Sequence, residues 1–192
     1  MKQAKVLTET EIRRLLKIVA TTRHSDRNRI VVMLSFLCGL RASEIANLRV
    51  KDVISSDSEI RDIIYLEKWQ TKNKKAQSVV VSNSLRKELD IYFNKNQFLV
   101  SNREGKLIRS QKRNGFSSQS IQNLFRGLYK DAHIENASSH SGRRTFITNL
   151  SEKGVSTRVI QELARHSSMV TTQRYIDVSD DKLRNAANLV AL

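Results

Sequence analysis

Apolar residues recur at helical spacing through the first fifty residues of the chain. Thr8 and Glu11 have the spacing of a capping box, the pattern that satisfies the first backbone N–H groups of a helix. A second, buried helix is predicted at about residues 26–38, because it contains a long apolar run, and it is expected to end at Gly39, since glycine commonly terminates helices. The other positions at this spacing are Ile12, Leu15, Leu16 and Val19 in the first helix, and Ile45 and Leu48 in a short third helix.

The pattern changes to alternation in the next segment. Residues 60–67 alternate between faces and are rich in β-branched and aromatic residues, and residues 78–81 form a second strand-like run. The polar segment between them, residues 69–77, is rich in lysine. Together these features predict a β-hairpin that presents lysines at its tip.

Helical spacing returns after the hairpin and continues to the end of the chain. The basic, polar segment at 101–116 fits a solvated loop and a DNA-backbone contact equally well. The pattern predicts a mainly α fold with a small antiparallel β-sheet. The further helices are expected at residues 84–94, 118–132, from about 140 to just before Gly154, 157–165 and 180–189.

Length and charge narrow the class of protein. A chain of 192 residues fits one compact domain, with a core at about residues 7–178 and a C-terminal helix within 179–192. Proline is absent, which suits helices. The net charge of +15, from 34 Lys and Arg against 19 Asp and Glu, points to a polyanionic partner. Nucleic acid is favoured over a membrane, because the longest apolar run, at 30–38, is too short to span a bilayer.

The cysteine content restricts the possible chemistry. Cys38 is the single cysteine, which excludes an intramolecular disulfide and a cysteine-based zinc site. Since it lies in the apolar run at 30–38, we expect an inert core thiol. The first residues do not read as a secretory signal, so we expect a cytoplasmic protein.

Candidate catalytic residues concentrate between residues 140 and 175. His140 and Arg143 are three residues apart, which places both on one face of a helix and within reach of one phosphate. Arginine offers a planar fork that matches two phosphate oxygens, and histidine moves protons near neutral pH. His166 and Tyr175 follow, and Arg41 and Lys72 offer further cations upstream.

Each candidate also has a structural explanation when it is taken alone. His140 and Arg143 fit a surface pair, and Arg41 fits a helix-start arginine paired with Glu44. Lys72 fits a solvated lysine on the hairpin, and His166 fits a capping or core histidine. Tyr175 fits a buried tyrosine.

Taken together and in order, five short elements of the chain resemble the motifs of the tyrosine site-specific recombinases, the phage integrase family. The resemblance extends from about Leu7 to Val190 and implies the catalytic-domain fold of that family. The chain resembles either the catalytic half of a longer recombinase or a small single-domain member without an N-terminal DNA-clamping domain. The elements are Gly39–Glu44, Thr71–Asn73, His140–Arg143, His166–Ser168 and Thr171–Tyr175.

The resemblance implies a role for each candidate. Arg41 and Arg143 are similar to the family's two phosphate-binding arginines, and Tyr175 to its nucleophile. His140 would act as the base and His166 would hydrogen-bond the scissile phosphate. The two remaining positions are Lys72, the hairpin lysine that would protonate the leaving 5′-oxygen, and Glu44, an acidic residue that supports the site.

Four positions depart from the family's pattern, although none removes a reacting group. Gly142 stands where leucine is frequent, and Arg144 stands where histidine is frequent. Arg165 occupies a position where glycine is common, and Val80 one where proline is frequent. We expect Arg165 to alter the local charge and Gly142 to loosen the helix that starts near His140.

The resemblance also implies the reaction and its partners. The chain would cut and rejoin double-stranded DNA through a 3′-phosphotyrosyl intermediate, with no metal and no other cofactor, as a homo-oligomer (a tetramer) on DNA. The C-terminal helix would dock on a neighbouring subunit, and the source would be a prokaryote, a phage or another mobile element. Further DNA contacts are expected from Lys74, Lys75, Arg113 and Arg144.

Three other functions remain open on the sequence. Residues 146–165 read as helix, turn at Gly154 and helix, which fits a non-catalytic helix-turn-helix regulator. A type IB-like topoisomerase would share the tyrosine chemistry without exchanging partners. A helical protein with no nucleic-acid role is the third alternative.

Overall fold

The computed structural model describes residues 3–71, 74–110, 115–176, 183–184 and 187–188. It is mainly helical, with one two-stranded antiparallel sheet among these residues. None of the helices within the described ranges is long and apolar enough to cross a membrane. The elements are α1 (Glu9–Thr21), α2 (Ser25–Cys38), α3 (Ala42–Asn47), α4 (Val50–Val53), β1 (Ile63–Leu66), η1 (Lys68–Gln70), β2 (Gln77–Val80), α5 (Asn83–Lys95), η2 (Gln97–Leu99), α6 (Ser118–Asp131), α7 (Ser141–Glu152), α8 (Thr157–Ala164) and α9 (Met169–Gln173).

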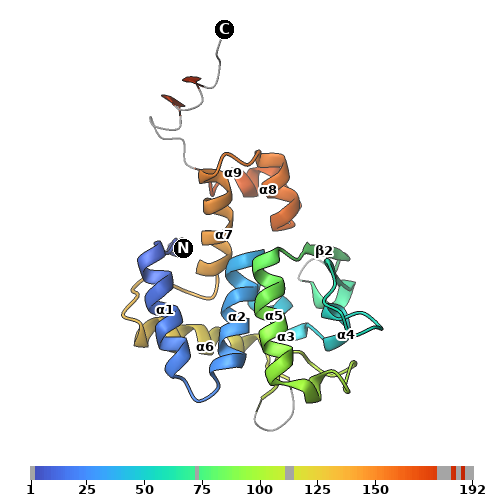
Figure 1. The fold of residues 1–192 in the computed structure, drawn as a ribbon. Helices are drawn as coiled ribbons and strands as arrows, with labels where there is room; N and C mark the ends of the chain where they lie inside the picture. Colours follow the sequence, from blue (N-terminus) through green and yellow to red (C-terminus); the bar gives the residue numbers. More distant parts are fainter. Residues whose placement is uncertain (1–2, 72–73, 111–114, 177–182, 185–186, 189–192) are drawn as a thin grey trace.

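Helix α2 is the centre of the body. It packs against α1, α5 and α7, and α6 crosses behind them (Figure 1). Because α2 is covered on several sides, its apolar residues run almost without interruption from Ile30 to Leu34 and are buried. The sequence expectations for this part are confirmed: α1 begins with the capping box of Thr8 and Glu11, and α2 ends at Gly39.

The end of α2 places the first site residue. Gly39 takes the left-handed conformation with φ of 62°, which costs glycine little and lets the chain reverse. Leu40 is then buried in the core, and Arg41 becomes the N-cap residue of α3. Arg41 is therefore held at the junction of two helices whose positions are set by packing.

The hairpin forms as predicted, with shorter strands than expected. β1 and β2 pair antiparallel with Ile63 opposite Val80, and the buried face carries Ile64, Leu66 and Val79. Beyond η1, the hydroxyl of Thr71 accepts a hydrogen bond from the backbone of Lys75 at 3.2 Å and donates one to its carbonyl at 2.7 Å. Buried Thr71 thus fixes the chain at the base of the hairpin tip. Lys72 is the next residue in the sequence.

The segment at 101–116 is tied to the body through its described residues. Leu107 and Ile108 are buried, and the side chain of Arg103 donates to the carbonyls of Ser55 and Ile54 at 2.6 and 3.3 Å. Lys106 donates to Asn47 at 3.0 Å. This part of the chain is therefore packed against α3 and α4 and is not simply a solvated loop.

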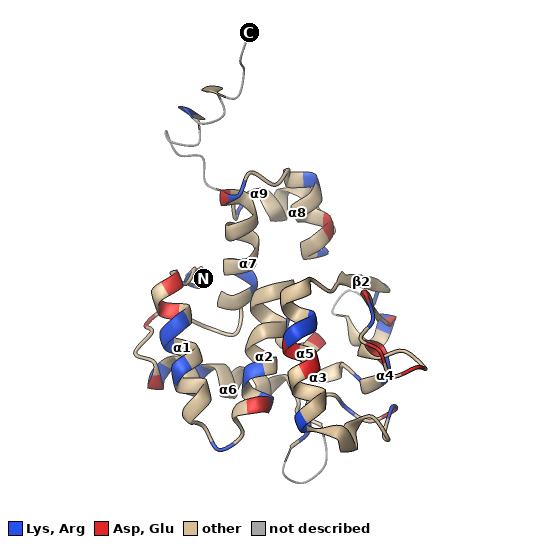
Figure 2. Ribbon diagram, viewed as in Figure 1, with Lys and Arg blue, Asp and Glu red and all other residues tan. Residues whose placement is uncertain are grey.

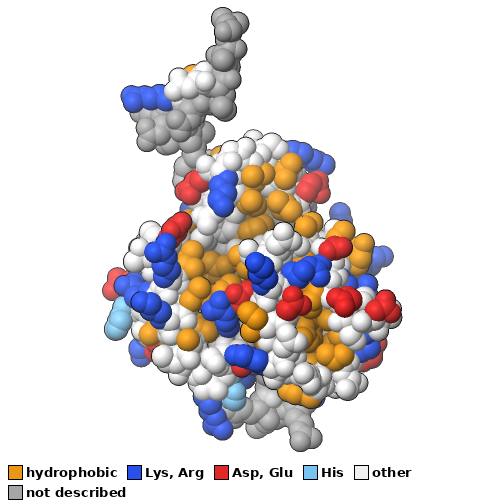
Figure 3. Space-filling view, viewed as in Figure 1, with side chains coloured by type: hydrophobic (Ala, Val, Ile, Leu, Met, Phe, Trp, Pro, Cys, Tyr) orange, Lys and Arg blue, Asp and Glu red, His pale blue; other side chains and the backbone are white. Residues whose placement is uncertain are grey.

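The last helices form a small lobe at the end of α7. Helix α7 rises from the body and carries α8 and α9 at its far end (Figure 1). Ile147, Ile160 and Ala164 form a second hydrophobic cluster there, separate from the main core. On the face drawn in Figure 3, hydrophobic side chains gather over this α8–α9 lobe, where Val159 and Val170 are exposed. The helix expected at 180–189 lies largely outside the described residues.

Gly142 has a different role from the one expected. A Cβ atom at this position would lie 2.4 Å from Oγ of Ser35 and 2.8 Å from Cδ2 of Phe36, both on α2. Real side chains do not approach this closely, so the glycine allows α7 to pack directly against α2. Gly142 therefore secures the position of the helix that carries Arg143.

Substitution of Gly142 by alanine is expected to destabilise the protein by about 1–3 kcal/mol, because the added methyl group overpacks the α2–α7 contact. Gly127→Ala in α6 is the matched control, since nothing lies within 4 Å of a Cβ atom there. Its helix propensity should raise stability by up to about 1 kcal/mol. Chemical denaturation of both variants measures the difference, and equal free energies of unfolding would contradict the packing argument.

Candidate active site

Arg41 and Glu44 form the first contact of the site. Nη1 of Arg41 donates to Oε1 of Glu44 at 2.6 Å, and the backbone N–H of Arg41 donates to Oε2 at 2.9 Å. Glu44 is fully buried, whereas the side chain of Arg41 keeps 21% of its surface exposed. The carboxylate therefore fixes one edge of the guanidinium and leaves the other able to meet a ligand.

Arg143 is buried between the body and the lobe. Its Nη1 donates to the carbonyl of Gly39 at 2.6 Å, and its Nη2 donates to the carbonyl of Ala164. Only 4% of the residue is exposed. The basic segment near the start of α7 lies beside the end of α2 (Figure 2), which is where these bonds form. Arg143 consequently joins Gly39, the C-cap residue of α2, to Ala164, the last residue of α8.

Arg165 completes a group of three guanidinium side chains. Its Nη2 donates to Oε2 of Glu44 at 3.1 Å and to the carbonyl of Gly39 at 3.2 Å. Glu44 is thus shared by Arg41 and Arg165, and the Gly39 carbonyl is shared by Arg143 and Arg165. The convergence expected for Arg41 and Arg143 is present: both lie around one short stretch, residues 39–44.

The charges of this cluster act on one another. Burial, followed by the charges of Arg41 and Arg165, lowers the pKa of Arg143 to about 9, so the guanidinium is still protonated at neutral pH. Burial would raise the pKa of Glu44, but Arg165 and Arg41 outweigh it and hold that pKa below its usual value. With one carboxylate against three cations, the described site carries excess positive charge suited to an anionic ligand.

His166 and Tyr175 lie beside each other in the lobe. The rings stack with centroids 5.6 Å apart and an angle of 23° between their planes. Nδ1 of His166 is 2.9 Å from Oγ1 of Thr172, which is fully buried on α9. Burial, then the charges of Arg143, Arg41 and Arg165, lowers the pKa of His166 to about 4. The imidazole is therefore neutral at physiological pH, with its orientation held by Thr172.

Tyr175 and His140 line one cavity of about 620 Å³. The sequence spacing places His140 within the helix, but α7 begins at Ser141, so His140 is its N-cap residue and is exposed. The N-terminal residues Gln3 and Ala4 line the same cavity. The expected base and nucleophile thus line the same cavity, while Arg143 is buried.

Arg144 lies against Tyr175. Its guanidinium carbon is 5.9 Å from the centre of the Tyr175 ring, and its Nη1 donates to the carbonyl of Ala4 at 2.8 Å. A contact of Arg144 with DNA stays a prediction. The described structure instead shows it linking the tyrosine to the N-terminal segment, whose Leu7 N–H donates to Thr145 on α7.

The hairpin candidates are placed in part. Lys74 and Lys75 are exposed at the tip, and Lys74 has a positive φ of 51°. Lys72 and Arg113 lie outside the described residues. The contacts of Lys74, Lys75 and Arg113 with DNA, and the role of Lys72 as an acid, stay predictions.

Two contacts of the site were not predicted from the sequence, although the effect of Arg165 on the local charge was. Thr172 belongs to the Thr-Thr-x-x-Tyr pattern, but nothing in the pattern shows that its hydroxyl meets His166. The buried ion pair of Arg165 joins residues more than one hundred positions apart and has no local signal. Cys38 agrees with expectation: burial raises the pKa of its thiol to about 12, so the thiol stays protonated.

Comparison with known proteins identifies the family. The tyrosine recombinase XerA of Thermococcus kodakarensis is 33% identical over 186 residues, which cover 95% of this chain and 61% of that protein. A crystal structure of XerA recombinase matches 98% of this chain and 66% of its own, with a TM-score of 0.76 and 26% identity. A XerH site-specific recombinase bound to palindromic difH substrate, in a post-cleavage complex, has a TM-score of 0.73 at 18% identity, covering 97% of this chain and 53% of that one.

The chain spans about 60% of the length of the curated relative it matches. The model of the phage integrase family matches residues 5–182, which include every candidate catalytic residue. The geometry of Arg41, Arg143, His166 and Tyr175 and the match over most of the sequence agree, and the chain belongs to the phage integrase family.

Proposed function

We propose that this chain cuts and rejoins DNA site-specifically through a covalent bond between Tyr175 and a 3′-phosphate. The observation that supports this most is the convergence of Arg41 and Arg143 around residues 39–44, near enough to His166 for their charges to lower its pKa, with Tyr175 stacked on the histidine. The relatives named as tyrosine recombinases support the same reaction. Since the chain covers only part of their length, the activity of the whole protein is included in the proposal.

The arginines would bind the scissile phosphate. A phosphodiester repels an anionic nucleophile, and its pentacoordinate transition state carries more negative charge than the ground state. Arg41 presents a partly exposed guanidinium edge, and Arg143 has further N–H groups besides the two that the Gly39 and Ala164 carbonyls accept. Both cations are fixed before DNA arrives, so little reorganisation is needed in the transition state.

Proton transfers complete the step. The phenol oxygen of Tyr175 attacks phosphorus while its proton passes to His140, which faces the same cavity. The bond from phosphorus to the 5′-oxygen breaks, and Lys72 protonates that oxygen. A 5′-hydroxyl from a partner strand then attacks the phosphotyrosine, which releases Tyr175 and restores the phosphodiester. Phosphodiester energy is conserved, so the scheme needs no ATP.

The state of His166 suits a hydrogen-bond donor. When Nδ1 of the neutral imidazole accepts a hydrogen bond from the Thr172 hydroxyl, the ring carries its own proton on Nε2. That N–H would donate to a non-bridging oxygen of the phosphate. His166 would thus orient the phosphate through a directional hydrogen bond, and the nearby arginines would neutralise its charge.

The alternatives differ from this proposal in what they need. A helix-turn-helix regulator would use α7, the turn at Gly154 and α8, but it would not require the buried arginines or a stacked tyrosine. A topoisomerase would share the cleavage step. Exchange of flanking sequence between two sites on one supercoiled plasmid marks a recombinase, whereas relaxation alone marks a topoisomerase.

Double-stranded DNA is the proposed partner, and a homo-oligomer, a tetramer, is the proposed assembly on it. The net charge of +15 and the substrate-bound XerH complex support the first point. The location we propose is the cytoplasm of a prokaryotic host, since the relatives come from archaea, bacteria and a transposon.

Tyr175→Phe is expected to abolish a covalent protein–DNA adduct that the wild-type chain forms. Duplexes tiled from the DNA flanking the source gene, with bridging 5′-phosphorothiolates, trap the intermediate because the thiol leaves readily and religates poorly. The adduct is detected by denaturing electrophoresis with EDTA present. Tyr65→Phe, at an exposed tyrosine of β1, is the control and should retain the adduct. An adduct in Tyr175→Phe would refute the assignment of the nucleophile.

Arg143→Lys is expected to slow cleavage by about 100-fold or more, because lysine keeps the charge but loses the fork that binds the phosphate. DNA affinity should fall much less, since most binding energy comes from other backbone contacts. Single-turnover cleavage and a filter-binding titration measure the two effects, and thermal unfolding verifies the fold. Equal losses in rate and affinity would remove the transition-state role.

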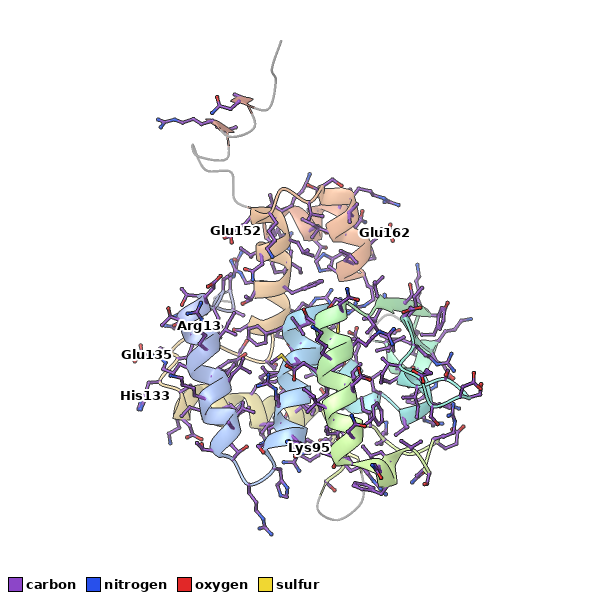
Figure 4. All side chains as sticks on the ribbon, in the orientation of Figure 1. Arg13, Lys95, His133, Glu135, Glu152 and Glu162 are labelled. Carbon is purple, nitrogen blue, oxygen red and sulfur yellow. The ribbon has the colours of Figure 1, made fainter. Side chains whose placement is uncertain are left out.

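The unfolding free energy is expected to fall as the pH is lowered from about 6.5 to about 4. His166 titrates at about 4 in the folded chain against 6.5 ordinarily, so the unfolded chain binds the extra proton first. Stability from the neutral imidazole is complete above 6.5. His166→Gln should flatten this slope, whereas His133→Gln, at a residue that projects from the edge of the body (Figure 4), should keep it. Urea denaturation at several pH values is the measurement.

A further inference from the structure

Arg165 occupies a backbone conformation that arginine rarely adopts. It is the C-cap of α8 with φ of 56° and ψ of 44°, the left-handed region in which side chains other than glycine and asparagine are strained. Glycine would take this conformation without cost. An arginine at this position therefore lowers the stability of the folded chain. This cost suggests that the side chain has a compensating role.

Burial adds further unfavourable terms. The side chain of Arg165 is 3% exposed, and its Nε is enclosed without a hydrogen-bond partner among the described residues. Its charge also repels the guanidinium of Arg143 nearby. A buried ion pair seldom yields net stability once its desolvation is counted, so stability alone does not explain this arginine.

The contacts of Arg165 join the two halves of the site. Its Nη1 donates to the carbonyl of Cys38 at 3.2 Å, and its Nη2 reaches the Gly39 carbonyl and Glu44. These three acceptors lie on the body, at the end of α2 and the start of α3, while Nη1 also donates to the carbonyl of Leu163 within α8 at 3.1 Å. Arg165 itself belongs to the lobe, directly before His166. The residue thus links the elements that carry Arg41 to those that carry His166 and Tyr175.

Glu44 is the group through which this link reaches the substrate. Its two carboxylate oxygens are divided, with Oε1 accepting from Arg41 and Oε2 accepting from Arg165 and from the Arg41 backbone. Removal of Arg165 would leave Oε2 with the Arg41 backbone N–H as its remaining partner among these contacts, and would let the carboxylate shift toward a second N–H of the Arg41 guanidinium. That movement would turn the exposed edge of Arg41 away from its present direction.

We infer that Arg165 is a positioning residue of the catalytic site, which holds Glu44 so that Arg41 faces the scissile phosphate and which docks the His166–Tyr175 lobe on the body. This inference rests on the proposed cleavage reaction and adds a third arginine to it. Arg165 does not need to touch DNA in this role.

Arg165→Gly isolates the side chain, because glycine keeps the left-handed backbone without strain. We expect its single-turnover cleavage rate to fall by about tenfold or more, the effect of losing a buried, charge-assisted hydrogen bond, while the DNA dissociation constant changes by less than about threefold. Arg165→Lys restores one donor and the charge, so its rate should lie between those of wild type and Arg165→Gly. A purely structural contribution would show as a loss of folded protein instead.

Arg158→Ala is the matched control. This arginine lies on the same α8 helix and pairs with Glu162 at 2.8 Å, but both side chains are more than two-thirds exposed. Glu162 points outward in Figure 4. The variant removes the same charge, and its cleavage rate should stay within about twofold of wild type. An equal loss in both variants would attribute the effect to net charge and overturn the inference.

A double-mutant cycle with Glu44→Gln tests whether Arg165 acts on Arg41 through Glu44. If Arg165 acts through Glu44, adding Arg165→Gly to Glu44→Gln should slow cleavage by less than about threefold further. Independent, multiplying losses would overturn the inference, as would a wild-type rate in Arg165→Gly or a parallel loss of DNA affinity.

The same cycle is measured on urea unfolding of the free protein, and the coupling there does not depend on cleavage. Absence of an adduct from wild type would contradict the proposed reaction alone. Absence of coupling between Arg165 and Glu44 in unfolding would contradict the positioning role alone.

Discussion

The site depends on the buried guanidinium of Arg143, held between the carbonyls of Gly39 and Ala164. These carbonyls end two helices that belong to different hydrophobic clusters, the main core and the α8–α9 lobe. Helix ends leave carbonyl groups without intrahelical partners, so a buried cation between two such ends satisfies both. The side chain proposed to bind the phosphate therefore also connects the two clusters.

This arrangement makes the lone carboxylate of Glu44 disproportionately important. Three buried or half-buried guanidinium groups would repel one another without a counterion, and the lowered pKa of Arg143 reflects that repulsion after burial. Glu44 relieves part of the repulsion and leaves a net positive charge for the phosphate to neutralise. A bound DNA backbone would thus supply the charge balance that the free protein lacks, which fits preorganisation for an anionic ligand.

Much of the fold follows from local sequence, whereas the site follows only in part. The capping box at Thr8, the apolar run before Gly39 and the alternation before the lysine-rich tip each predict the element that forms. The short helices α4 and α9 were missed, because few apolar positions mark them. Arg41, Arg143 and Tyr175 were found through motif order, but the role of Arg165 was not. A left-handed arginine and its distant carboxylate are consequences of packing, and no spacing in the sequence records them.

The N-terminal segment has a practical consequence for work with this protein. Gln3 and Ala4 form part of the wall around Tyr175, and the Ala4 carbonyl receives the arginine that lies against the tyrosine ring. An affinity tag fused at this end would lie close to the cavity that Tyr175 and His140 line. Cleavage kinetics measured on such a fusion would reflect the tag as well as the chain itself, so a cleavable tag is the safer design.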